Sequence, residues 1–160
     1  MKLRLLLVIV SIMTMFSFRA MAEMYLQVDG IAGDTGGTDK AHQGAMLVSG
    51  IKGATVKAGS VDPITFVKPF DHSSAGLISY CLNGTKIEHV TFDYSAGSNL
   101  IHRIFLTNAA ITSYVPVYDK NSGFQQAEEI TFSFDKIKFD NGQSGKNGQV
   151  EWDNVNKKTQ

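Results

Sequence analysis

The chain has 160 residues, which is room for one ordinary domain. Apolar residues make up 43% of it and the formal net charge is zero, which excludes a disordered chain and a strongly basic nucleic-acid-binding protein. A single cysteine excludes an internal disulfide framework and a cysteine-rich zinc site. Its 15 glycines against 3 prolines favour a turn-rich β protein, because glycine destabilises the interior of a helix.

Residues 1–22 have the layout of a secretory signal peptide. A basic start precedes an uncharged, mostly apolar run over residues 5–18, and residues 20–22 read Ala-Met-Ala, a small-x-small cleavage site. The apolar run is shorter than the roughly 20 residues that a membrane-spanning helix needs, so no stable membrane insertion is expected. If this segment is used, the protein is periplasmic. If translation starts at Met21 or Met24, it assembles in the cytoplasm before secretion to the extracellular space.

Residues 23–160 are expected to form a single domain built from strands. Alternation of apolar and polar side chains with period two predicts half-buried strands. The two clearest cases, given by the residues that share a face, are Val90, Phe92 and Tyr94, and Ile130, Phe132 and Phe134. Further strands are expected at Tyr25–Asp29, Ala45–Ile51, Ile64–Lys68, Ile101–Tyr114 with a break near Asn108, and Val150–Val155.

The alternation changes phase between two of these segments. Ile137 and Phe139 continue the pattern that ends at Phe134, but with the opposite parity. A slip of one residue turns every later side chain to the other face of a sheet. We therefore expect a bulge or a sharp bend near Asp135–Lys136.

Only one segment, at about residues 73–82, has helical spacing of its apolar residues. The candidate N-caps are Asp71, Ser73 and Ser74, and Asn83–Gly84 predicts the end of the helix. Cys81 falls on the inner side, where we expect it to pack rather than react. The expected fold is mainly β, an antiparallel two-sheet β-barrel or sandwich with one short α-helix.

Motifs typical of catalysis or ion binding are weak. Asp34–Thr35–Gly36 matches the aspartic-protease triplet, but a glycine-rich loop holds it instead of a buried strand. Asp29, Asp34 and Asp39 leave open a weak structural ion site. Asp119–Gly123 departs from a calcium-binding loop in the position of its glycine.

The histidines show no metal-binding spacing either. None has another histidine two or four residues away, so a zinc site would need distant residues to converge; they are His42, His72, His89 and His102. We expect no catalytic residue, no cofactor, no resident metal and no nucleic-acid partner.

Five stretches occur in a characteristic order along the chain. They are Met24–Ile31, Ile64–Ser74, Leu77–Gly84, Ala127–Phe134 continued by Ile137–Phe139, and Val150–Asp153. Their order, spacing and total length resemble the haemolysin-coregulated protein (Hcp) family, the tube protein of bacterial type VI secretion. The resemblance covers nearly all of residues 23–160.

The resemblance implies a function in assembly rather than in catalysis. It implies a homohexameric ring, rings stacked into a secreted tube, and the spike, sheath and effector proteins of the secretion machine as partners. The chain departs from the family at its start, because tube subunits usually lack a signal peptide. An exported monomeric β-sandwich binding module, lectin-like or adhesin-like, is the alternative; a hydrolase would need a triad or convergent carboxylates that the sequence does not show.

Two regions are candidates for contacts between copies. Residues 50–60 match the family's extended loop between early strands in position, which implies a ring-stacking role for Gly50, Ile51, Lys52, Val56 and Lys57; a plain hairpin connection is the alternative. Trp152, the only tryptophan, is predicted either to close the core or to lie at a subunit interface, where aromatic residues are enriched.

Overall fold

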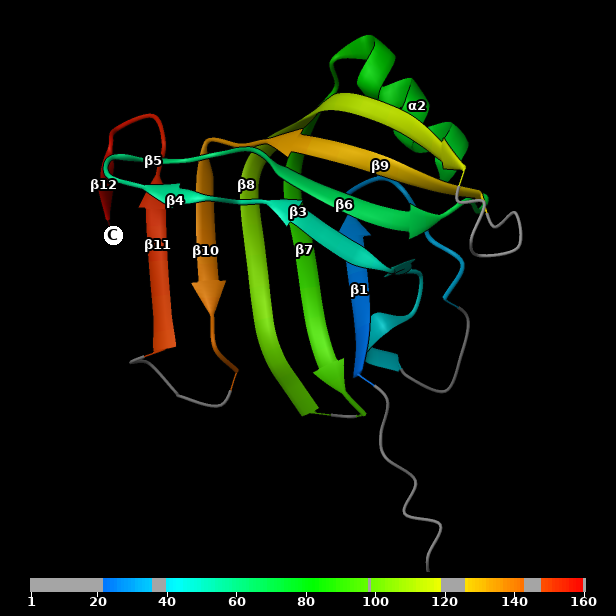
Figure 1. Cartoon of the computed structure of the whole chain (residues 1–160), viewed down its shortest axis with the longest axis horizontal. Coiled ribbons are helices and arrows are strands. Elements are labelled where there is room, and N and C mark those ends of the chain that lie inside the picture. The colour runs from blue at the N-terminus through cyan, green and yellow to red at the C-terminus, as the bar shows by residue number, and fades with distance from the viewer. Residues whose placement is uncertain (1–21, 36–39, 98, 119–125, 143–147, 160) are drawn as a thin grey trace, which may run out of the picture.

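Antiparallel strands form most of the computed structural model, which describes residues 22–35, 40–97, 99–118, 126–142 and 148–159 (Figure 1). The strands are β1 (Ala22–Val28), β2 (Met46–Val48), β3 (Gly50–Gly53), β4 (Val56–Lys57), β5 (Ser60–Val61), β6 (Ile64–Pro69), β7 (Lys86–Ala96), β8 (Asn99–Tyr118), β9 (Gln126–Ser133), β10 (Lys136–Asp140), β11 (Gln149–Asp153) and β12 (Lys158–Thr159). A 3-10 helix, η1 (Lys40–His42), and an α-helix, α2 (Ser74–Asn83), complete the described elements. The predicted mainly β fold class is confirmed.

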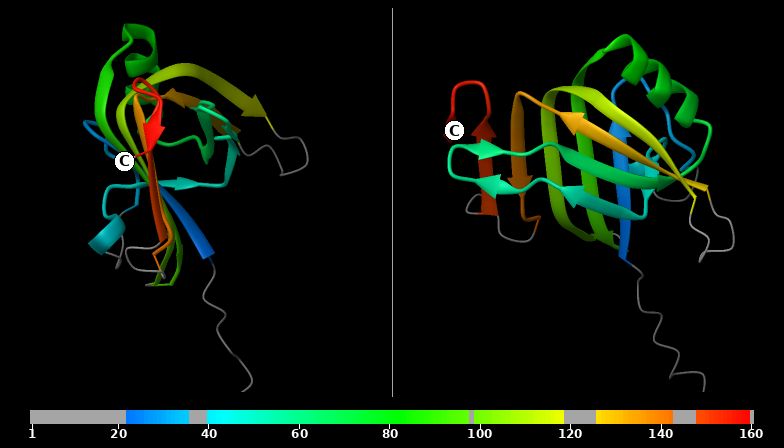
Figure 2. Two further views of the ribbon diagram at one scale, coloured as in Figure 1. Left: turned by 90° about the vertical axis from the view of Figure 1, so that its left-hand side faces the viewer. Right: turned by 45° about the horizontal axis from the view of Figure 1, so that its top comes forward.

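The long strand β8 belongs to both layers of the fold. Its first half pairs with β10 and β7 in a layer ordered β12-β11-β10-β8-β7-β1-β2. Its second half pairs with β9, which continues to β6 and β3 in the other layer. The ladder ends at β12, β2 and β3, so the two layers form a sandwich and not a closed barrel (Figure 2).

The core lies between the two layers and follows the predicted alternation. Phe66 on β6 packs against Phe92 of β7 and Phe132 of β9, with ring centroids 5.3 Å and 5.8 Å apart. Offset and edge-on aromatic contacts at these separations are favourable beyond the area they bury. The two sets of alternating residues predicted to share a face, those that begin at Val90 and at Ile130, point into the core, with Tyr94 only partly buried.

The helix α2 covers the top of the sandwich in Figure 1, close to the predicted position. Gly84 ends it with φ 60°, and its N–H donates a hydrogen bond to the carbonyl of Cys81. A left-handed residue that stops a helix in this way is most often glycine, because it has no Cβ. Leu77 is buried beneath the helix and Cys81 packs partly against the core, as predicted.

Two strand predictions need correction. Ala45–Ile51 is not one strand, because the chain passes from one layer to the other after β2, where the Ser49 N–H donates to the Val67 carbonyl at 2.7 Å. The strand predicted to break near Asn108 is continuous, although Asn108 has φ 51°. The side chains of Leu106 and Ala109 are both buried although their parity differs. Asn108 therefore shifts which residues face the core, and the strand continues through it.

The predicted bend after Phe134 is confirmed. β9 ends at Ser133 and β10 begins at Lys136. Phe134 and Ile137 are both buried although their parity differs, because the chain turns between them from one layer into the other.

Candidate interaction surfaces

Exposed apolar side chains lie on several strands and on the helix α2. The large apolar residues with the greatest exposure in the described chain are Leu47, Ile51, Val56, Phe70, Leu82, Val115, Val150 and Val155. Single exposed apolar residues are ordinary, but a group of them on one surface marks an interaction site. Two sets of these residues are considered below as candidate contact surfaces.

The first group, here named the strand end, is formed by Val150 and Val155, which are 56% and 65% exposed. Val150 lies on β11 and Val155 in the turn between β11 and β12, at the left of Figure 1. β12 pairs only with Trp152 and Asp153, so the rest of β11 has no strand neighbour on that side among the described residues. Unpaired backbone groups on such an edge favour association with another strand.

The second group, here named the helix end, is formed by Leu47 on β2, Phe70 directly after β6, and Leu82 on α2. Leu82 is 81% exposed, and the helix sequence SAGLISYCLN contains no charged residue. A helix on a protein surface normally carries charged side chains on its solvent face. An uncharged exposed helix is therefore typical of a contact surface.

The predicted ring-stacking loop folds as strands that pair with each other and with β6, and it contacts the turn after β11. β3 pairs with β6, and Val56 pairs with Val61 between β4 and β5. The amide of Asn154, in the turn after β11, accepts from the Val61 N–H at 3.2 Å and donates to the Val61 carbonyl at 3.3 Å. Val56 is 67% exposed at the hairpin. We name this hairpin, residues 56–61, the reaching hairpin.

Both lysines of that loop already have carboxylate partners. Lys52 Nζ lies 2.5 Å from Glu129 Oε1 on β9, and Lys57 Nζ lies 2.6 Å from Asp62 Oδ2. All four side chains are partly exposed, so each ion pair contributes little to stability. The stacking role of Lys52 and Lys57 stays a prediction.

Trp152 is half-buried and packs against the core. It lies opposite Ile137 across β10 and β11, and its Nε1–H donates to Asn154 Oδ1 at 2.9 Å. The indole N–H is therefore satisfied within the chain. The ring packs against the core, and its place at a subunit interface stays a prediction.

Next to the helix end, an ionic cluster lies under the start of α2. Lys68 Nζ lies 2.7 Å from Glu128 Oε1 and 2.9 Å from Asp71 Oδ1. Tyr114 donates its hydroxyl hydrogen to the other oxygen of Glu128. Burial, followed by this hydrogen bond to Glu128, raises the pKa of Tyr114. Burial alone would raise the pKa of Asp71, but hydrogen bonds from Ser73 and Lys68 outweigh it and leave the pKa lowered.

A second buried group holds η1 against the outer face of β7. Arg103 binds Asp93 through Nε and Nη2 at 2.6 Å and 2.7 Å, and His42 Nε2 lies 3.1 Å from the same carboxylate. The hydrogen bond to Asp93 raises the pKa of Arg103. The His42 ring stacks on Tyr25 with centroids 4.0 Å apart. In the sequence, His42 stands out only as one of four histidines without metal-binding spacing.

The outer face of β8, β10 and β11 carries an open hollow of about 390 Å³. Phe105 lies among charged side chains of both signs there; the lining residues are Arg103, Phe105, Thr107, Lys136, Lys138, Asp140 and Glu151. Such mixed charge does not point to one class of ligand.

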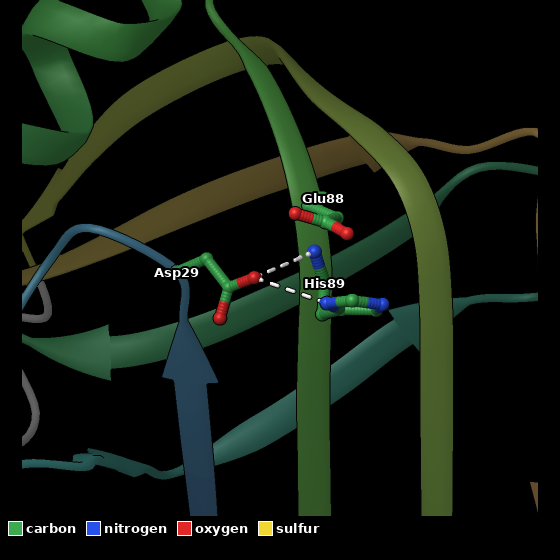
Figure 3. A group of neighbouring side chains, drawn as sticks. All are labelled: Asp29, Glu88 and His89. Carbon is green, nitrogen blue, oxygen red and sulfur yellow. Dashed lines mark hydrogen bonds and ion pairs between the residues drawn. The ribbon is translucent and has the colours of Figure 1, made fainter.

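The predicted ion site of Asp29, Asp34 and Asp39 stays a prediction, because one of its three residues is not described. Asp34 contacts His72, whereas Asp29 contacts His89, and Asp39 lies outside the described residues. The segment Asp119–Gly123 also lies outside the described residues, so the structure does not test the prediction made for it. Asp29 lies instead beside Glu88 and His89 (Figure 3).

The described helices include none that is both long enough and apolar enough to cross a membrane.

Comparisons with known proteins find one family model and several solved structures that are similar to this chain. The family model for the type VI secretion system effector Hcp matches residues 25–140. The structure is similar to Hcp1 from Salmonella typhimurium, with a TM-score of 0.75 and 19% identity over 88% of this chain and 100% of that one. It is also similar to a type VI secretion system effector from Yersinia pestis, with a TM-score of 0.69 and 28% identity over 81% and 98% of the two chains. Secreted Hcp3 from Pseudomonas aeruginosa gives a TM-score of 0.66 and 20% identity over 82% and 96%. The comparison with curated proteins gave no match.

Proposed function

Because the chain belongs to the Hcp family of type VI secretion proteins, we propose that it is the structural subunit of a secretion tube. In this proposal six copies form a ring, rings stack into a tube, and the tube can carry effectors. The spike, sheath and effector proteins of the secretion machine are its partners.

The observation that carries the proposal is that the first layer of the sandwich has two unlike ends. β11 and β12 lie at one end of the first layer, and β1 and β2 lie at the other. The two apolar groups are different surfaces, so contact between them joins copies head to tail. A head-to-tail contact produces a closed ring when the rotation between copies closes.

The chemistry of the two ends also suits this contact. The strand end offers valines and an unpaired strand edge, and the helix end offers an uncharged helix with an exposed leucine. Burial of apolar area drives association without requiring a charged partner. Contacts made by shape and apolar burial agree with a structural role rather than with catalysis.

The start of the chain decides between the tube subunit and its alternative. Residues 1–22, used as a signal peptide, would send single copies to the periplasm, where an exported monomeric binding module would act. Translation from Met21 or Met24 would leave the subunit in the cytoplasm for assembly before secretion. Mass spectrometry of the N-terminus of the native protein separates these starts.

Mixing two end variants tests the head-to-tail contact. Val155→Asp removes the apolar strand end, and Leu82→Asp removes the apolar helix end. Each variant alone is expected to remain monomeric, because each ring contact needs both ends. An equal mixture is expected to give dimers, since the intact helix end of the first variant meets the intact strand end of the second.

Circular dichroism of both variants controls for folding, which the high exposure of Val155 and Leu82 favours. Rings from either variant alone, or a mixture that stays monomeric although wild-type chains form rings, would show that the two ends do not meet.

A further inference from the structure

We propose that Asp29, Glu88 and His89 form a binding site for one divalent cation of the Zn²⁺ class. The site lies where the end of β1 meets β7 (Figure 3). It is independent of ring formation.

An irregularity in the sheet places two neighbouring side chains of β7 together. Ile87 and Val90 are both buried, so Glu88 and His89 both lie toward the outside of the sandwich. In a regular strand, adjacent side chains point to opposite faces. β8 changes its facing at the same level, around Asn108 with φ 51°.

Backbone pairing then brings Asp29 to the same place. Val28 lies opposite Val90, and the Asp29 N–H donates to the His89 carbonyl at 3.2 Å. The His89 N–H donates in return to Asp29 Oδ2 at 3.0 Å, and His89 Nδ1 lies 3.2 Å from the same oxygen. The Asp29 carboxylate is therefore held in position by the backbone of β7.

The separations of the ligand atoms suit a small cation. One oxygen of Asp29, one oxygen of Glu88 and one ring nitrogen of His89 all lie within 4.8 Å of one another. Zinc binds carboxylate oxygen and imidazole nitrogen at about 2.1 Å, so its ligand atoms stand roughly 3 to 4 Å apart. Asp29 Oδ2 and His89 Nδ1 already lie within this range at 3.2 Å, and the exposed Glu88 side chain is able to rotate toward them.

One of the two carboxylates at the site lacks a partner among the described residues. Two carboxylates lie beside one imidazole, and in the described part of the chain Glu88 makes no hydrogen bond or ion pair. Two like charges this close repel each other, and a cation between them removes the repulsion. The imidazole nitrogen favours zinc, nickel or cobalt over calcium and magnesium, which prefer oxygen ligands.

The imidazole is also oriented before a cation binds. The His89 ring packs on Phe105 of β8, with centroids 5.1 Å apart. A ligand ring held by its surroundings loses less freedom on binding a metal. Asp34 and His72 form a pair with one carboxylate and one imidazole but, among the residues that the structure describes, without a third donor, which supplies a matched control.

Calorimetric titration of the chelator-treated full chain with Zn²⁺ tests the site. One equivalent is expected to bind. Glu88→Gln and His89→Gln are each expected to weaken that binding at least tenfold, whereas His72→Gln leaves it unchanged. Because a cation that binds only the folded state stabilises it, Zn²⁺ is also expected to raise the Tm of the wild type and not that of Glu88→Gln.

Glu88 is exposed and contributes nothing to the core, so the Glu88→Gln variant folds and keeps the test decisive. Absence of Zn²⁺ binding to the wild type would overturn the proposal. Binding that survives both Glu88→Gln and His89→Gln, or that disappears in His72→Gln, would overturn it as well.

Discussion

Lys68 and Glu128 lie directly opposite each other on β6 and β9, with charged atoms 2.7 Å apart and no side-chain surface exposed to solvent. Both point toward the core, in line with Phe66 and Ile130 on their own strands. The apolar core therefore ends in an ion pair, which lies next to the first turn of α2.

Breaking this pair is expected to destabilise the fold strongly. Glu128→Ala leaves the Lys68 ammonium buried with only Asp71 as a carboxylate partner, so we expect a loss of about 3–5 kcal/mol of unfolding free energy. Glu129→Ala, one residue later, removes only the exposed pair with Lys52 and is expected to cost at most about 1 kcal/mol. Urea unfolding of both variants measures the difference. Equal losses would contradict the burial argument.

Acid is expected to weaken the fold partly through Asp71. Its pKa in the folded chain is lower than the ordinary value of 3.8, so the unfolded chain takes up the proton first as the pH falls. The stability from this carboxylate is complete above the unfolded pKa and is lost as the pH falls through the folded pKa. Asp71→Asn should therefore lose stability at neutral pH and show a shallower decline in acid. Unfolding free energies measured from neutral to acidic pH check this.

Asp153 is also expected to make the fold less stable in acid. Hydrogen bonds from the backbone and side chain of Asn156 lower its pKa. Some acid sensitivity is therefore expected to remain in Asp71→Asn. A pH profile identical to that of the wild type would contradict the role given to Asp71.

Asn154 is expected to hold the reaching hairpin against the turn after β11. Its amide bonds both backbone groups of Val61 and the Nε1–H of Trp152. Asn154→Ala leaves these groups without their partner, so we expect a loss of about 1–3 kcal/mol and faster hydrogen exchange at Val61. The fluorescence of the only tryptophan reports the change at Trp152. Asn156→Ala, in the same turn, removes the side-chain hydrogen bond to Asp153 Oδ2 and should leave exchange at Val61 unchanged.

Charge reversal in the stacking loop is expected to weaken contacts between rings. Lys52→Glu and Lys57→Glu should shorten tubes seen by electron microscopy while single rings persist. Each reversal also breaks a pair within the chain, so Lys57→Glu combined with Asp62→Lys restores that pair with its charges exchanged. Continued loss of stacking in the double variant would support a contact between rings. Normal tubes in both single variants would show that the loop assignment is wrong.

The sequence predicted the elements best where side-chain alternation and packing agree. Phe92 and Phe132 follow the period of two, and both pack on Phe66. Gly84 ends the helix as predicted, because its left-handed conformation is a local property. The bend after Phe134 was visible as a change of parity.

Features that depend on pairing between distant strands were not predictable. Lys68 and Glu128 lie on the buried faces of their strands. A search for alternating apolar residues does not assign charged residues to the core, so it missed both of them. The meeting of Asp29 with His89 depends on the register of β1 on β7, which no local signal gives. The division of Ala45–Ile51 follows from the crossing between layers, where tertiary pairing overrides strand propensity.

The central claim is that copies of this chain recognise one another through unlike ends of one sandwich. Light scattering coupled to size-exclusion chromatography, over a wide range of concentrations, measures the mass of the assembled particle directly. The proposal predicts a particle of six chains. A particle with the mass of one chain at every concentration would contradict it.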